Sequence, residues 1–439
     1  MASYSKHGTK KVRRSLQCNP EIFPKNPKIS NEITESPISP DINIDVETFE
    51  ALESPYENVA HEDVAKPRKV NPKGALLDIT KFGAKPNADS TQALMSAWKD
   101  ACAAPGATGV LVPKGVFKAN TVNFVGPCKG EMTFNLQGTL QAPDKIETPG
   151  WLSFKHVDKL TITGSGTLDG QGEQMWKTQP LCFKKVTACK SKAINLRLDF
   201  VNTGVLEGIT SLNSKNFHIN IMSCNDFIVR KVKIIAPAES PNTDGIHVAR
   251  SKGVTIIDTD IGTGDDCVSV GDGTTDLKVT NVKCGPGHGI SVGSLGLYPK
   301  EEPVTGITVS GCTLTNTDNG VRIKSWPDKY GCDVSGIHFS DITMTNVANP
   351  VIVDMMYCPY SKCNTKGPSK VKITDISFKG IKGTTPTPEA IKLNCMPGSC
   401  NKIELANIDL KQVGGKGVAI ANCSNIKPTI TGTLSPKGC

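Results

Sequence analysis

Aromatic residues and long apolar runs are scarce in this 439-residue chain. Phe, Trp and Tyr make up only 5% of the residues, whereas the chain has 41 glycines and 29 prolines. This balance disfavours a helical bundle and is typical of folds rich in turns and short strands. No stretch approaches 18 consecutive apolar residues, so the sequence predicts no membrane-spanning helix.

A dense basic tract is also missing. The 50 Lys and Arg residues exceed the 42 Asp and Glu residues, which gives a formal net charge of +8, but they are scattered along the chain. This mild surplus favours anionic partners. Because the basic residues form no dense tract, we expect no nucleic-acid partner. An acidic polymer would match the positive charge equally well.

The 16 cysteines form no paired C-x2-C array, so we expect no zinc site. Cys358 and Cys363, like Cys395 and Cys400, are close pairs that predict small disulfide loops in an oxidising compartment. We therefore expect a secreted, extracellular protein. Met1 to Pro20 nevertheless has no apolar signal-peptide run. We favour a gene model that lacks its true first exon over unconventional export or no export.

Two segments of different composition divide the chain. Residues 1–74 are rich in Pro, Glu, Asn and Ser and predict a disordered or propeptide-like segment, with the folded domain at 75–439. Near the start of that domain, Asp89 or Ser90 can cap a helix. Its apolar face would comprise Leu94, Ala97, Trp98 and Ala101, and such a helix would suit the open end of a stacked structure.

Short β-branched segments recur from about residue 159. Six of them begin at Lys159, Asp226, Gly253, Asp276, Gly306 and Gly336, and the last five are 27, 23, 30 and 30 residues apart. Each alternates apolar and polar residues, and repeats of this length indicate a solenoid. We therefore predict an all-β chain in which each repeat is one coil of a parallel β-helix. A sandwich of hairpins would need strands at regular spacings of 8–12 residues, which are missing.

A second series places polar residues in one register. Gly245-Ile-His-Val, Cys267-Val-Ser-Val and Gly289-Ile-Ser-Val follow one another at 22-residue steps, and Gly320-Val-Arg-Ile-Lys and Pro350-Val-Ile-Val continue the series. Asp244, Asp266 and His288 directly precede the first three segments. Because coils of a parallel ladder repeat about every 4.8 Å, we expect these side chains to form a ladder on one face.

The same face should also carry Asp265, beside Asp266, and the cations Arg322 and Lys324. Crowded carboxylates cannot all ionise easily, so one can donate a proton while another draws a proton from water. Arg and Lys can hold an anionic sugar by its carboxylate. Alone, each motif is weak evidence, since Asn-Thr-Asp is common in turns and Arg-x-Lys usually marks a solvated strand face. Their shared register favours a functional interpretation.

Four blocks of this sequence resemble the signature blocks of the plant polygalacturonases, a family of pectin-degrading glycoside hydrolases. They are Pro241-Asn-Thr-Asp-Gly-Ile-His, Gly264-Asp-Asp-Cys-Val-Ser, Gly285-Pro-Gly-His-Gly-Ile-Ser and Val321-Arg-Ile-Lys, in the family's order and spacing. The resemblance runs from about residue 75 to Cys439. Gly293-Ser-Leu-Gly and Tyr357-Cys-Pro-Tyr resemble the pollen-type exopolygalacturonases in particular.

This resemblance implies a right-handed parallel β-helix that hydrolyses α-1,4-linked galacturonan with inversion and without a metal or other cofactor. Asp265 would be the general acid, Asp244 and Asp266 would activate water, and His288 would tune the acid. The implied substrate-binding residues are Arg322, Lys324, Tyr357 and Asn242. The implied disulfides are Cys267–Cys284, Cys395–Cys400 and Cys423–Cys439. The family often has Asp-Gln ahead of the tyrosine, where this chain has Met355-Met356.

Pectin or polygalacturonate is thus the expected partner of a monomeric enzyme, with cleavage from the non-reducing chain end. An endo-acting polygalacturonase differs only in whether loops block one end of the cleft. A lyase would rather use Ca²⁺-binding carboxylates and a lone basic Arg or Lys. An inactive β-helical surface or binding protein is the alternative outside enzymes, although it has no reason to keep Asp244, Asp265 and Asp266 together.

Overall fold

A computed structural model describes residues 75–178, 192–359, 363, 367–414 and 418–439. The segment 1–74, predicted to be disordered or propeptide-like, lies outside these residues. Within them, every strand pairing is parallel, which excludes the sandwich of hairpins. No helix among the described residues is long and apolar enough to cross a membrane.

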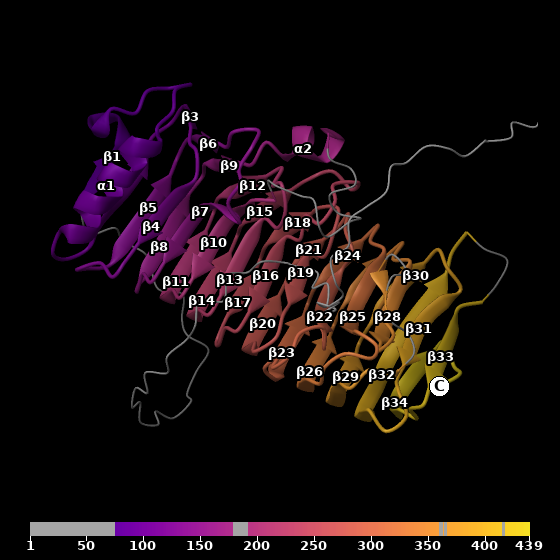
Figure 1. The fold of residues 1–439 in the computed structure, drawn as a ribbon. Helices are drawn as coiled ribbons and strands as arrows, with labels where there is room; N and C mark the ends of the chain where they lie inside the picture. The colour runs from indigo at the N-terminus through magenta and orange to yellow at the C-terminus, as the bar shows by residue number, and fades with distance from the viewer. Residues whose placement is uncertain (1–74, 179–191, 360–362, 364–366, 415–417) are drawn as a thin grey trace, which may run out of the picture. The chain divides into compact units, whose positions relative to one another are not determined.

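Three stacked rows of strands form the β-helix, and Figure 1 shows them following one another from the indigo to the yellow end. The first row is an 11-stranded sheet that carries the predicted ladder. Its strands are β4 (Val122–Val125), β7 (Gly150–Lys155), β10 (Ile194–Asp199), β13 (Ile219–Met222), β16 (Ile246–Ala249), β19 (Val268–Val270), β22 (Ile290–Leu295), β25 (Asn319–Ser325), β28 (Asn349–Asp354), β31 (Glu389–Asn394) and β33 (Ile420–Ser424).

The second row contains the repeat that the sequence predicts. Its strands are β1 (Leu76–Asp78), β2 (Thr108–Val112), β5 (Met132–Leu136), β8 (Leu160–Gly164), β11 (Asn202–Glu207), β14 (Asn225–Arg230), β17 (Thr255–Ile257), β20 (Thr275–Thr280), β23 (Val304–Ser310), β26 (Asp333–Ser340), β29 (Lys372–Lys379), β32 (Cys400–Gln412) and β34 (Thr429–Ser435). The parallel β-helix is therefore confirmed. Between the first two predicted segments lies β11, an additional coil that the repeat analysis missed.

The third row consists of very short strands. They are β3 (Val116–Lys118), β6 (Thr139–Gln141), β9 (Thr167–Asp169), β12 (Thr210–Leu212), β15 (Lys233–Ile235), β18 (Asp260–Gly262), β21 (Lys283–Cys284), β24 (Thr313–Thr315), β27 (Thr343–Thr345) and β30 (Lys382–Thr385). Each precedes the turn that leads into a strand of the first row. These turns bring the candidate site residues to the edge of the first row.

The core is made of columns of apolar side chains that stack from coil to coil. Ile246, Val268, Ile290 and Val321 are register partners in successive strands of the first row, and all four are buried. The alternation of side chains in a strand sends these residues inward and the intervening residues outward. A fixed inner column therefore also fixes the outer one.

The predicted capping helix is confirmed as α1 (Thr91–Ala103), which lies at the end of the stack that begins with β1 (Figure 1). Its buried face consists of Ala93, Leu94, Ala97, Trp98 and Ala101, and the Trp98 ring lies 5.0 Å from that of Phe124 in β4. Asp89 Oδ1 accepts a hydrogen bond from the Thr91 N–H at its first turn. The seven-residue helix α2 (Gly172–Thr178), which follows β9, was not predicted from the sequence.

Candidate active site

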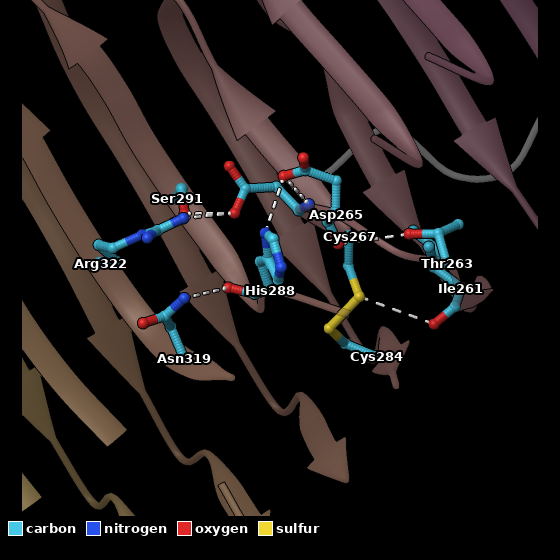
Figure 2. Close-up of a disulfide and its surroundings, with 10 residues drawn as sticks. Ile261, Thr263, Asp265, Cys267, Cys284, His288, Ser291, Asn319 and Arg322 are labelled. Carbon is cyan, nitrogen blue, oxygen red and sulfur yellow. Dashed lines mark hydrogen bonds and ion pairs between the residues drawn. A yellow bond between two sulfur atoms is a disulfide. The ribbon is translucent and has the colours of Figure 1, made fainter. Parts of the chain in front are cut away.

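The predicted ladder forms along one edge of the first row. Ile246 pairs with Val268 and Val268 with Ile290, so Asp244, Asp266 and His288 all stand two residues before paired positions. Val321 is the next partner, which puts Asn319 at the fourth position. The Asn319 amide donates to the His288 carbonyl oxygen at 3.3 Å (Figure 2). The 22-residue comparison stopped at His288, although the same offset from Val321 identifies Asn319.

Asp266 lies at the centre of the charged groups and is buried. Its Oδ1 accepts hydrogen bonds from Ser291 Oγ and Arg322 Nη2, both at 2.8 Å, and its Oδ2 accepts one from Lys324 Nζ at 2.7 Å. Burial alone would raise the pKa of Asp266, but Lys324 and Arg322 lower it to about 2. The two cations therefore favour the ionised form of Asp266.

Asp244 is buried as well, but within the described part of the chain it forms no ion pair like those of Asp266 with Arg322 and Lys324. Burial and the nearby charges of Asp265 and Asp266 raise its pKa well above the usual range, while a hydrogen bond from Ser269 and the charge of Lys324 oppose this. Two neighbouring carboxyl groups thus differ in how readily they hold a proton.

Asp265 pairs with His288 (Figure 2). Its Oδ1 lies 3.0 Å from His288 Nδ1 and accepts a 2.8 Å hydrogen bond from the Asp266 N–H. About a quarter of the Asp265 side chain is exposed, which makes it more accessible than Asp244 or Asp266. Burial would lower the pKa of His288, but its hydrogen bond to Asp265 and the charges of Asp265, Asp266 and Asp318 raise it.

Asp318 was not predicted from the sequence. Its Oδ2 lies 3.3 Å from His288 Nε2, so the imidazole bridges two carboxylates. The glycines on either side of His288 allow this approach. A Cβ on Gly287 would lie 2.7 Å from the Asp265 carbonyl oxygen, and one on Gly289 would lie 2.2 Å from that of Asn319. Both residues have positive φ, so other side chains would be strained there.

Arg322 and Lys324 reach the site from β25, as predicted, but both point back onto Asp266. Tyr357 lies over them, with its ring centroid 5.2 Å from Lys324 Nζ and 5.9 Å from Arg322 Cζ. The Tyr357 N–H donates to the Ser325 carbonyl oxygen, and Trp326 packs perpendicular to its ring at 5.6 Å. Met355 and Met356 thus leave the tyrosine beside the cations.

Asn242 lies farther out. Its amide donates to Asn216 Oδ1, and within the described structure it has no hydrogen bond to the charged residues of the site. This half-buried asparagine adopts a left-handed backbone conformation with φ 57° in the turn before β16. The structure therefore places it near Asp244 along the chain without joining it to the charged cluster.

Disulfides brace this region and the C-terminal coils. The structure contains the pairs Cys267–Cys284, Cys395–Cys400 and Cys423–Cys439 implied by the resemblance, and the predicted Cys358–Cys363 loop. Cys267–Cys284 ties the residue that follows Asp265-Asp266 to the end of β21, the next short strand along the chain (Figure 2). Cys102–Cys128, which the sequence did not indicate, joins α1 to the segment after β4.

Asp265, Asp266 and His288 are the only described residues that meet the geometry of a three-ligand metal cluster, with donor atoms within 4.8 Å of one another. Their chemistry fits a metal poorly. Both oxygens of Asp266 are already bonded to Lys324, Arg322 and Ser291, and two cations in contact would repel a third positive charge. Proton transfer is the chemistry that this arrangement favours.

Comparison with known proteins agrees with this geometry. The family model described as glycosyl hydrolases family 28 matches residues 102–435. An exopolygalacturonase of Oenothera organensis is 50% identical over 355 residues, covering 80% of this chain and 98% of the relative. An exopolygalacturonase of Platanus acerifolia is 46% identical over 374 residues, covering 84% and 99%.

Among solved structures, a polygalacturonase from Erwinia carotovora subsp. carotovora aligns with a TM-score of 0.64. At 23% identity, the alignment covers 84% of this chain and 99% of that one, and it supports the fold. The family match spans more than half of the chain, and the two plant relatives are covered almost completely. This chain is a member of glycosyl hydrolases family 28.

Proposed function

We propose that the protein is a polygalacturonase, which hydrolyses the α-1,4-galacturonosyl linkages of pectin with inversion, from the non-reducing chain end. The observation that carries this proposal is the pair of cations on Asp266, beside two further carboxyl groups. This arrangement places acid–base groups beside two positively charged side chains, Arg322 and Lys324. The two plant relatives named exopolygalacturonase support the substrate and the exo mode.

The accessible carboxyl group of Asp265 protonates the glycosidic oxygen as the bond from C1 to that oxygen breaks. A water molecule attacks C1 from the opposite side and gives up its proton to Asp244, with ionised Asp266 helping to orient it. The proton that Asp265 gives to the leaving oxygen is balanced by the proton that Asp244 takes from water, and the two sugar products then leave the site. His288, between Asp265 and Asp318, holds the acid by its hydrogen bond.

Arg322 and Lys324 bind the carboxylate of a galacturonate unit. Their two positive charges lie side by side on Asp266 and form the part of the site that can attract an anionic sugar. Tyr357 lies over both cations and is placed to pack against the same sugar. Asn242 would contact substrate from the Asp244 side of the site.

Secretion fits the disulfides. The described residues contain five of them, and such bonds persist in oxidising compartments. We propose that the enzyme acts outside the cell, on the pectin of the cell wall.

Chromatography of early products from polygalacturonate tests this function. Monomeric galacturonic acid as the sole early product supports the exo-hydrolase. A ladder of oligomers would instead indicate an endo-acting hydrolase, and unsaturated products would indicate a lyase. A protein that binds polygalacturonate without releasing reducing ends would be a binding protein, and the hydrolase proposal would fail.

A further inference from the structure

His247 lies next to the site, yet none of the roles above uses it. It occupies the outward position of β16, where it is the register partner of Ser269 in β19. Ser291 and Arg322 follow at the same position in β22 and β25. The imidazole therefore belongs to the row of side chains that ends at the cation of the proposed substrate site.

A short hydrogen-bond chain joins this imidazole to a carboxyl group of the site. His247 Nδ1 lies 2.8 Å from Ser269 Oγ, and Ser269 is in turn the hydrogen-bonding side chain that lowers the pKa of Asp244. Since a hydroxyl has one proton, a serine that donates to an ionised Asp244 must accept from its other partner. His247 Nδ1 then carries the proton, and its Nε2 is left with a free lone pair.

Nε2 is open to a ligand. Among the described residues, no group forms a hydrogen bond with this nitrogen. It is also not one of the side-chain polar atoms that are buried without a partner, so it is accessible. Gly271 leaves the space beside it, because a Cβ there would approach Nε2 to 3.2 Å. Phe217 packs against the ring with centroids 5.1 Å apart and holds its plane.

We propose that His247 is a positioning residue for Asp244, holding Ser269 so that its hydroxyl serves the carboxylate, while Nε2 accepts a hydroxyl of the sugar on that side. This inference rests on the proposed function, which it deepens by naming a contact with the sugar that is released. Burial raises the pKa of Asp244, and the hydrogen-bond chain through Ser269 opposes this rise, because a donor to the ionised form stabilises that form.

The charged surroundings are consistent with a neutral imidazole. Asp265, Asp266 and Lys324 face Asp244, whereas Lys324, Asp266 and Asp272 surround His247. Burial and the charge of Lys324 lower the pKa of His247 to about 4, against the opposing effect of the two aspartates. The ring is thus uncharged at mildly acidic pH and can present a lone pair.

Three variants separate the two halves of the proposal. Ser269→Ala removes the hydroxyl between His247 and Asp244. His247→Gln keeps a polar group only near the position of Nε2, whereas His247→Asn keeps one only near the position of Nδ1. We expect the first two to move the acidic limb of the kcat/KM profile on polygalacturonate upward by about half to one pH unit. His247→Asn should leave that limb in place and raise KM roughly three- to tenfold, the effect of one neutral hydrogen bond.

A matched control lies on another face of the β-helix. His338 Nδ1 and Ser377 Oγ in β26 and β29 form the same kind of pair at 2.9 Å, away from the site. Ser377→Ala should change neither the acidic limb nor KM. If Ser269→Ala behaves like Ser377→Ala, His247 does not position Asp244, and an unchanged KM in His247→Asn would overturn the sugar contact.

A measurement without substrate separates this inference from the function itself. In ¹⁵N-histidine-labelled wild-type protein, with His247 assigned through His247→Asn, the ring should be the Nδ1–H tautomer at neutral pH. Ser269→Ala should increase the Nε2–H form. A wild-type Nε2–H tautomer overturns the proposal even if polygalacturonate is hydrolysed, and failed hydrolysis with the Nδ1–H tautomer would instead refute the proposed function.

Discussion

Ser269 and Ser291 are register partners on adjacent strands, and each lowers the pKa of a different aspartate of the site. Ser291 accepts a 3.0 Å hydrogen bond from Arg322 Nε and donates to Asp266. Ser269 lies instead against His247. The group behind each serine therefore differs, a guanidinium in one case and an imidazole in the other, and this difference parallels the opposite pKa shifts of Asp266 and Asp244.

Asp266→Asn should destabilise the fold strongly. The substitution leaves Arg322 and Lys324, both largely buried, facing a neutral amide, and breaking a buried ion pair in this way costs about 3–5 kcal/mol. Urea unfolding measures the change in the free energy of unfolding. Asp265→Asn is the matched control, because that side chain is partly exposed, and it should cost much less. Equal stability of the two variants would contradict the central role of Asp266.

The stability of the wild-type protein should fall in acid through Asp266. Its pKa of about 2 in the folded protein lies below the unfolded value of ~3.9, so its stabilising effect is present above pH ~3.9 and is lost as pH falls toward 2. This effect is on the order of 2 kcal/mol. Asp244 acts in the opposite sense, since its raised pKa makes stability fall as pH rises above ~3.9.

Subtracting the urea curves of Asp266→Asn from those of the wild type at each pH isolates the contribution of Asp266. The difference should shrink from pH 4 to pH 2. A difference that stays constant over this range would mean that the Asp266 carboxylate is not held ionised by its partners.

The sequence predicted the ladder because its cause is local and periodic. Apolar residues such as Ile246, Val268 and Ile290 stack in a column, and a column fixes the register of whatever precedes it. Steps of 22 residues were therefore enough to bring Asp244, Asp266 and His288 to one edge. The Cys267–Cys284 disulfide, by contrast, was expected from the family resemblance and not from cysteine spacing.

What the sequence could not indicate depends on side-chain direction and on irregular coils. The alternation of side chains in β25 predicts that Arg322 and Lys324 point outward. It does not predict that both side chains turn back onto Asp266. The bridge from His288 to Asp318 depends on a turn conformation. Short strands such as β21, with two residues, carry too little pattern to be recognised.

Asp265→Asn and Asp244→Asn should differ in their response to the leaving group. Loss of a general acid or base typically lowers the rate by 10²–10⁴-fold. With an aryl galacturonide whose leaving group needs no protonation, Asp265→Asn should recover much of its activity, whereas Asp244→Asn should not. The initial rate of aryl release measures this, compared with release of reducing ends from polygalacturonate. Recovery in Asp244→Asn alone would exchange the two roles, as the raised pKa of Asp244 would allow.

The Cys267–Cys284 disulfide should matter for activity beyond its effect on stability. Replacing both cysteines by serine opens a bridge of sequence separation 17, which is worth about 3 kcal/mol. The Cys423→Ser/Cys439→Ser variant opens one of separation 16 and should lose a similar amount. Only the first bridge adjoins Asp265 and Asp266, so only its loss should lower kcat well below the unfolding temperature. Thermal unfolding and kcat, measured side by side, test this, and equal kcat in both variants would contradict it.

Lys324→Met should impair turnover as well as binding. If Lys324 only held the sugar carboxylate, its loss would raise KM and leave kcat unchanged. Its 2.7 Å bond to Asp266 Oδ2 adds a second effect, because without it the carboxylate keeps only Arg322 and Ser291, and its pKa rises. We therefore expect a KM increase of at least tenfold together with a lower kcat, the latter partly restored at higher pH, where Asp266 is ionised again. Lys324→Arg keeps the charge and should show a smaller loss of kcat. A pure KM effect, with a pH profile like that of the wild type, would mean that the cation serves the substrate alone.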